Sequence, residues 1–163
     1  MQVTRERLIT WEDPLASAGA LREMSGLDAA RALRDGRVPP PPIARLMNFT
    51  IVEVEEGRVV FEGYPGEEHY NPIGVVHGGF ALALFDSAMG FAVHTTLPKG
   101  VAYTTTDVQV RFIRAITKDS GPVRCEATAV HVGRSTAVAE AKLRDGQGRI
   151  LGTGTTGCAI LRP

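Results

Sequence analysis

Cysteine, aromatic residues and net charge are all scarce in this chain of 163 residues. Only Cys125 and Cys158 are present, too few for a disulfide framework or a zinc ribbon, which favours a reducing compartment. The 18 basic residues balance the 18 acidic ones, so charge indicates neither a nucleic acid nor an anionic membrane as partner. The N-terminal sequence has no apolar run of signal-peptide length. We therefore expect a cytoplasmic protein.

The length suits one domain, or one domain with an appended arm. In the N-terminal part, Asp13 stands before a proline and can cap one helix, and Ser25 begins a capping box at a second. The run Pro39–Pro42 is a stiff, extended spacer without backbone donors. We therefore expect a helical arm with a proline linker over residues 1–42 and the main domain over residues 43–163.

Alternation of apolar and polar residues predicts six strands in the main domain. The predicted strands are two that form a hairpin within residues 49–64 and four around residues 108–112, 123–129, 137–143 and 149–161. A long helix separates the hairpin from the last four strands, which we expect to form a meander. An antiparallel sheet with one buried helix on its face is an α+β fold.

The stretch from His77 to Leu97 predicts the long helix around which the sheet is organised. Its residues are apolar around the whole circumference, which indicates a buried helix. It contains one carboxylate, Asp86, and begins with Gly78 and Gly79. We therefore expect Asp86 to be buried and to have either a partner or a chemical role.

The spacing of His77 and Asp86 argues for a site made by two chains. Nine residues are two and a half helical turns, so the two side chains leave opposite sides, roughly 13 Å apart along the axis. One chain cannot bring both to one small site. A two-fold axis can bring Asp86 of one subunit towards the His77 turn of another.

One motif resembles a known family. Asn71-Pro72-Ile73-Gly74-Val75-Val76-His77-Gly78-Gly79, followed by Asp86, resembles the hotdog-fold acyl-CoA thioesterases of the phenylacetate-pathway type. The stretches Thr104–Val110 and Val132–Arg134 also resemble that family, and the resemblance covers about residues 43–162. It implies a hotdog fold, with the sheet wrapped around one long helix, a homodimer or dimer of dimers, and an acyl-CoA substrate. We expect no cofactor and no metal.

The chemistry of the motif agrees with that implication. Thioester hydrolysis needs an oxyanion site, which N–H groups at a helix N-terminus supply, and Gly78 and Gly79 do not obstruct a carbonyl. The resemblance assigns the oxyanion contact to the Gly78 N–H, with Asn71 beside it. It makes Asp86 of the neighbouring subunit a general base or a nucleophile. His77 either orients the substrate or Asn71, or caps the helix.

The remaining substrate-binding candidates are threonines and arginines. The family has a Ser or Thr on the next strand that holds the water, and strand register does not decide here between Thr104 and Thr105. Arg134, like Arg111 and Arg114, is a candidate for the phosphates of coenzyme A, with a solvated strand edge as the alternative. The acyl group stays open, because its candidate pocket residues can equally be core: Phe80, Leu84, Met89 and Phe91.

Two other functions are compatible with the same fold. A hotdog acyl-CoA hydratase would need a different loop pattern, with an Asp before Asn71 that this chain lacks. A non-catalytic acyl-CoA-binding sensor has no need of a buried base, so Asp86 argues against it. The sequence therefore favours an acyl-CoA thioesterase over both alternatives.

Overall fold

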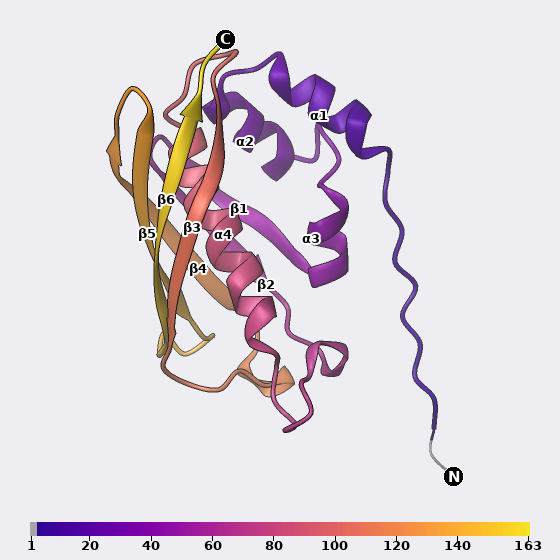
Figure 1. The fold of residues 1–163 in the computed structure, drawn as a ribbon. Helices are drawn as coiled ribbons and strands as arrows, with labels where there is room; N and C mark the ends of the chain where they lie inside the picture. The colour runs from indigo at the N-terminus through magenta and orange to yellow at the C-terminus, as the bar shows by residue number, and fades with distance from the viewer. Residues whose placement is uncertain (1–2) are drawn as a thin grey trace.

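The computed structural model of the protein describes residues 3–163. Four α-helices, six strands and two short 3-10 turns, η1 and η2, follow one another along them (Figure 1). In chain order they are α1 (Pro14–Arg22), α2 (Gly26–Arg34), α3 (Pro42–Met47), β1 (Phe49–Glu55), β2 (Arg58–Gly63), η1 (Glu67–His69), α4 (Gly78–His94), β3 (Ala102–Phe112), η2 (Lys118–Ser120), β4 (Val123–Val132), β5 (Thr136–Arg144) and β6 (Ile150–Leu161).

The strands form one antiparallel sheet in the order β1-β2-β4-β5-β6-β3, and α4 packs across one face of it (Figure 1). The predicted α+β arrangement of a sheet around one long helix is therefore confirmed. The prediction that the last four strands form a meander is wrong for β3. Only short turns join β4 to β5 and β5 to β6, whereas residues 113–122 carry the chain away from β3, which pairs with β6 at the sheet edge.

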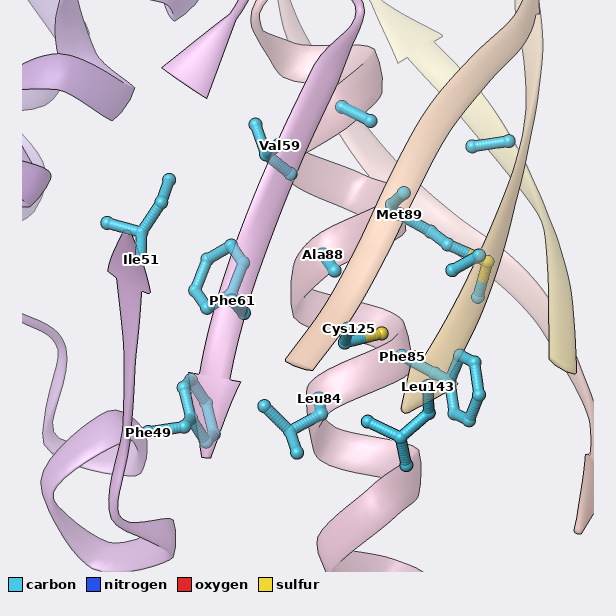
Figure 2. Packing of buried hydrophobic residues seen from close by; sticks show 14 of the residues in the cluster. Phe49, Ile51, Val59, Phe61, Leu84, Phe85, Ala88, Met89, Cys125 and Leu143 are labelled. Atoms are coloured by element: carbon cyan, nitrogen blue, oxygen red, sulfur yellow. The ribbon is translucent and has the colours of Figure 1, made fainter. Parts of the chain in front are cut away.

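The core lies between α4 and the sheet, where the predicted alternation puts apolar residues inward. In β5 the four positions from Ala137 to Leu143 that face α4 are buried, and the positions between them are exposed. Phe85 of α4 lies close against β6, since a Cβ on Gly154 would lie 2.8 Å from the Phe85 ring. Figure 2 shows Phe85, Leu84 and Met89 projecting from α4 among the side chains of the strands. Small residues on the sheet therefore let the helix approach it.

The N-terminal helices begin as predicted. The Asp13 carboxylate accepts the Leu15 N–H at 2.9 Å, and the Ser25 hydroxyl oxygen accepts the Asp28 N–H at 3.2 Å. Helix α2 packs on the end of α4, because the Gly26 N–H donates to the carbonyl of Leu97 at 3.0 Å. The alanines that α2 turns inward are buried: Ala29, Ala30 and Ala32. Helix α2 thus adds to the core of the main domain.

The extended spacer is shorter than predicted, because Pro42, the last proline of the run, is the first residue of α3. Proline is favoured at the first helical position, where its fixed φ suits the helix and its missing N–H costs nothing. The helix ends at Asn48, which takes the left-handed conformation at φ 54°. The proposed domain boundary between residues 42 and 43 falls inside this turn of helix and stays a prediction.

Burial of His94 predicts a specific loss of stability in acid. Desolvation lowers the pKa of this imidazole below its ordinary 6.5, and its Nδ1 has no hydrogen-bond partner among residues 3–163. The unfolded chain therefore binds the proton more tightly, so this contribution is complete above pH about 6.5 and is lost as pH falls towards the folded pKa. In urea titrations we expect His94→Leu to lose less unfolding free energy than wild type between pH about 7.5 and 5. The exposed His131→Gln should follow wild type, and equal slopes for all three proteins would contradict the prediction.

Candidate active site

Asn71 organises the turn that leads into α4. Its Oδ1 accepts the N–H groups of Ile73 at 3.1 Å and Val75 at 3.3 Å, and its own backbone N–H donates to the Val75 carbonyl at 2.8 Å. Gly74 completes the turn at φ +83°, which is a glycine conformation. These bonds hold Oδ1 inside the turn. The Asn71 Nδ2 group has no acceptor among the described residues and is available as a donor.

His77 caps the N-terminus of α4. Its Nδ1 accepts the Gly79 N–H at 2.8 Å, so a neutral ring carries its proton on Nε2. The first N–H groups of a helix lack partners inside the helix and lie at the positive end of its dipole. The N–H of Gly78 has no acceptor in the described part of the chain. The two predicted glycines therefore differ, because Gly78 keeps a free donor and Gly79 gives its own to His77.

Phe112 covers one side of Gly78. A Cβ on Gly78 would lie 3.0 Å from the Phe112 ring, so only glycine lets the ring come this close without a shift. The alternation of apolar and polar residues over 108–112 predicts that Phe112 faces the core, but this residue is 54% exposed. The prediction is wrong because β3 is an edge strand. Its residues that face α4 have a neighbouring strand, β6, on one side only, so their other side stays exposed. Phe112 is a functional candidate that alternation alone did not reveal.

Asp86 is exposed on the outer side of α4, together with Leu82. The predictions of a helix buried all round and of a buried carboxylate are therefore wrong for the single chain. The cause is again the edge position of β3, since the described residues put no further strand over this side of α4. The Thr105 hydroxyl donates to Asp86 Oδ1 at 2.8 Å. This bond fixes the carboxylate without burying it.

A β-bulge selects Thr105 over its neighbour. The β3–β6 register shifts between Thr105 and Asp107, which makes Thr106 an extra residue. Counting back by twos from the inward Val108 would place Thr106 and Thr104 towards the helix. The bulge reverses this order, so Thr105 faces α4 and Thr104 is exposed.

The three arginine candidates lie in different places. Arg134 is exposed in the turn between β4 and β5, beside the end of the sheet where β3 begins. Arg111 occupies one of the polar positions of β3 and lines a hollow on the sheet face opposite α4. Arg114 follows β3 at its other end, near Phe112. One chain therefore does not gather them around one ligand.

Three of the four predicted acyl-pocket candidates belong to the core of the single chain. Phe80, Leu84 and Met89 are at most 1% exposed (Figure 2 shows the last two). Phe91 is partly buried, with its ring centre 5.7 Å from that of Phe61. These residues support α4 rather than line an open pocket.

The chain presents two separate half-sites on α4. The first, which we call the loop half, consists of Asn71, His77 and Gly78. The second, the acid half, consists of Asp86 and Thr105. Gly78 and Asp86 are eight positions apart on the helix, about 12 Å along the axis, and no hydrogen bond in the described chain joins the halves.

The described residues form neither a metal-binding cluster nor a membrane-spanning helix. Residues 3–163 contain no group of three His, Cys, Asp or Glu side chains that could hold a metal ion. None of their helices is both long and apolar enough to cross a bilayer.

Comparison with known proteins agrees with the fold. The family model described as the thioesterase superfamily matches residues 73–151. A protein of Halobacterium salinarum named as an esterase is 33% identical over 125 residues, which cover 72% of this chain and 80% of that protein. The 1,4-dihydroxy-2-naphthoyl-CoA hydrolase of Listeria monocytogenes is 28% identical over 106 residues, covering 64% and 84% of the two chains.

A solved structure has a similar fold. The PaaI protein of E. coli, from its phenylacetic acid degradation operon, superposes with a TM-score of 0.73 at 19% identity, covering 84% of this chain and 94% of that chain. At that identity the likeness shows the fold, and the predicted hotdog fold is confirmed. Family model, relatives and fold agree with one another, and the chain belongs to the thioesterase superfamily.

Proposed function

We propose that the protein hydrolyses an acyl-CoA thioester to the free acid and coenzyme A. The observation that carries the proposal is the carboxylate of Asp86, held by the Thr105 hydroxyl at 2.8 Å on the open side of α4. A fixed, accessible carboxylate is what a water-activating base requires. The same helix offers an unused N–H at Gly78, which is what a developing oxyanion requires.

The reaction follows from these two groups. The thioester carbonyl oxygen accepts the Gly78 N–H at the positive end of the helix dipole, with the Asn71 Nδ2 group as a second donor. Asp86 takes a proton from water, whose oxygen bonds to the carbonyl carbon. The carbon–sulfur bond then breaks, and the leaving thiolate takes up the proton. Direct attack by Asp86, giving an anhydride that water opens, uses the same groups.

Two copies of the chain are needed to complete each site in this proposal. The loop half and the acid half lie about 12 Å apart on one helix, so each site draws one half from each subunit. Two features support a homodimer, or a dimer of such dimers. The outer edge of β3 has no partner strand in the described chain, and the apolar Leu82 is exposed beside Asp86. An unpaired strand edge of 11 residues is a ready surface for a second copy.

The coenzyme A part of the substrate is proposed on independent grounds. The Listeria relative is named as a hydrolase of an acyl-CoA, which supports a substrate of that class. Arg134 lies at the end of the sheet where β3 begins, so we assign it, with Thr104, to a phosphate-binding surface beside the acid half. Guanidinium suits phosphate because its donors match two oxygens at once.

A panel of acyl-CoAs tests the function directly. We expect the wild-type protein to release free thiol from at least one aromatic, medium-chain or branched acyl-CoA, followed with a thiol-reactive dye. Oxygen esters of the same acids serve as the comparison, and their hydrolysis is followed by acid release because they yield no thiol. Binding of acyl-CoAs without thiol release would instead identify an acyl-CoA sensor.

A further inference from the structure

The described chain begins with an extended segment, residues 3–12, that runs past α3 towards the loop carrying η1 (Figure 1). Its large apolar side chains do not hold it in place, since both Leu8 and Trp11 are exposed. Its side-chain bonds to the main domain come from Arg5 and Arg7. The side chain of Arg7 is 28% exposed and that of Arg5 is 73% exposed. Arg7 is therefore the more buried of the two polar attachments.

The Arg7 guanidinium joins two elements that are separate in the chain. Its Nη2 donates to the Arg45 carbonyl at 2.9 Å and its Nη1 to the Leu46 carbonyl at 3.3 Å, both in the last turn of α3. Carbonyls there lack partners inside the helix and lie at the negative end of its dipole, so a cation suits them. Nη1 also donates to the Glu68 carboxylate of η1 at 3.0 Å. Arg7 thus ties η1 to α3.

Polar contacts decide where η1 lies, because none of its three residues is fully buried. The Gly66 N–H donates to Nδ1 of His69, the last residue of η1, at 2.9 Å, so a neutral ring carries its proton on Nε2. The ring lies against Phe80 of α4, with ring centres 4.8 Å apart. The Arg7 Nη1 approaches its Nε2 to 3.4 Å. His69 is therefore held between a core residue and Arg7.

The charges around His69 favour the neutral ring that this arrangement needs. Burial lowers the pKa of His69, and of the two neighbouring charges the Glu68 carboxylate raises the pKa while the Arg7 guanidinium lowers it. The net change is a lower pKa. The ring can thus accept the Gly66 N–H at neutral pH.

His69 is also the residue at which the loop half is anchored. Its backbone carbonyl accepts the His77 N–H at 2.8 Å, and further along the loop the Asn71 N–H donates to the Val75 carbonyl at 2.8 Å. The loop is therefore a short ladder, with His69 and His77 paired at its base and Asn71 nearer its tip. A displacement of His69 moves Asn71 relative to Gly78, which belongs to the rigid helix.

We propose that Arg7 is a positioning residue for the loop half, because it fixes His69 and through it the place of Asn71 relative to Gly78. Its consequence for catalysis rests on the proposed function, in which Asn71 and Gly78 donate to the same carbonyl oxygen. Two donors must meet one developing oxyanion, so a small displacement of either lowers turnover more than it lowers binding. The extended segment, which lies outside the predicted main domain, is thus part of the working enzyme.

Arg7→Gln removes the charge and the forked donors but keeps a polar side chain. We expect kcat to fall roughly tenfold, because the oxyanion donors are displaced, while KM stays within about twofold. Arg5→Gln is the matched control, since it neutralises a nearby arginine whose partner, Glu67, belongs to the same turn. An exposed ion pair contributes little, so this control should keep kcat within about twofold of wild type. Equal losses in both variants would overturn the inference, because the contacts of Arg7 would then not be what matters.

Hydrogen exchange provides a test that does not depend on thioester hydrolysis. Backbone N–H groups across the loop are hydrogen-bonded, among them those of Asn71, Gly74, Val76 and His77. We expect these groups to exchange roughly tenfold faster in Arg7→Gln than in wild type, and at the wild-type rate in Arg5→Gln. Exchange over β4 and β5 should be the same in all three proteins, and thermal unfolding confirms that the variants are folded.

The two measurements separate the inference from the proposed function. Unchanged exchange of the loop in Arg7→Gln would overturn the inference, whether or not the protein is active. Faster exchange with an unchanged kcat would overturn it too, since Arg7 would then steady the loop without serving the reaction. Faster exchange in a protein that hydrolyses no thioester would support the link from Arg7 to the loop and remove the proposed function instead.

Discussion

Asp86→Asn is expected to fold normally and to lose thioester hydrolysis by on the order of a hundredfold or more, as loss of a general base should. A hundredfold corresponds to about 2.7 kcal/mol of transition-state stabilisation. Asparagine keeps an oxygen that can accept from Thr105, so the local geometry is retained while the basic group is lost. Asp86→Ala, which also removes that acceptor, should lose at least as much.

The exposure of Asp86 makes this variant easy to interpret. A buried carboxylate would leave an unpaired hydroxyl and a cavity when replaced, and lost activity could then reflect a damaged fold. Here the side chain lies outside the core, so we expect unfolding free energy to change by less than about 1 kcal/mol. Glu140→Gln, an exposed carboxylate on the other face of the sheet, is the matched control and should keep full activity.

The kinetic pattern identifies which role is lost. An interaction made only in the transition state lowers kcat and kcat/KM equally and leaves KM unchanged. A rise in KM alone would mean that Asp86 binds substrate and does no chemistry. Full turnover by Asp86→Asn would place the base elsewhere in the molecule and remove the proposed mechanism.

Much of the fold follows from local rules that the sequence displays. The caps at Asp13 and Ser25, the inward alanines of β5 and the turn at Asn71 depend on neighbouring residues alone. The loop half of the site follows for the same reason, because Asn71, His77 and Gly78 lie within eight residues that form one turn and one helix start. Such features are predictable because no distant part of the chain decides them.

The acid half depends on the topology and could not be predicted in the same way. The apolar circumference of α4 predicts a buried Asp86. The pattern of side chains along a helix does not, however, show which side of that helix the rest of the chain covers. That depends on β3 pairing with β6 at the sheet edge. The alternation of β3 does not decide whether Thr104 or Thr105 faces α4, because the bulge residue Thr106 reverses which face each earlier residue of the strand points to.

Mixing two inactive variants is expected to restore activity if each site takes one half from each subunit. The first variant is Asp86→Ala, which removes the acid half. The second is Asn71→Asp, which keeps the Oδ1 that accepts from Ile73 and Val75 but replaces the free Nδ2 donor with an anionic oxygen. The turn should therefore survive, while a negative charge beside the oxyanion lowers activity by on the order of a hundredfold.

In a dimer of one variant alone, both sites carry a defect. A heterodimer of the two variants puts both defects into one site and leaves the other site with a wild-type loop half and a wild-type acid half. Random reassortment makes half of the dimers mixed, and each of these has one good site. Activity should then recover to about one quarter of the wild-type level after subunit exchange.

Subunit exchange between the two variants has to be demonstrated. Two differently tagged preparations are mixed, the doubly tagged species is purified, and its activity per dimer is compared with wild type, with an expected value of about one half. Mixing either variant with itself under the same conditions is the control and should recover nothing. A purified heterodimer that stays inactive would show that Asn71 and Asp86 serve the same chain's site. The separation of about 12 Å along α4 would then have to be bridged by a movement of the helix start, because a rigid helix keeps that distance fixed.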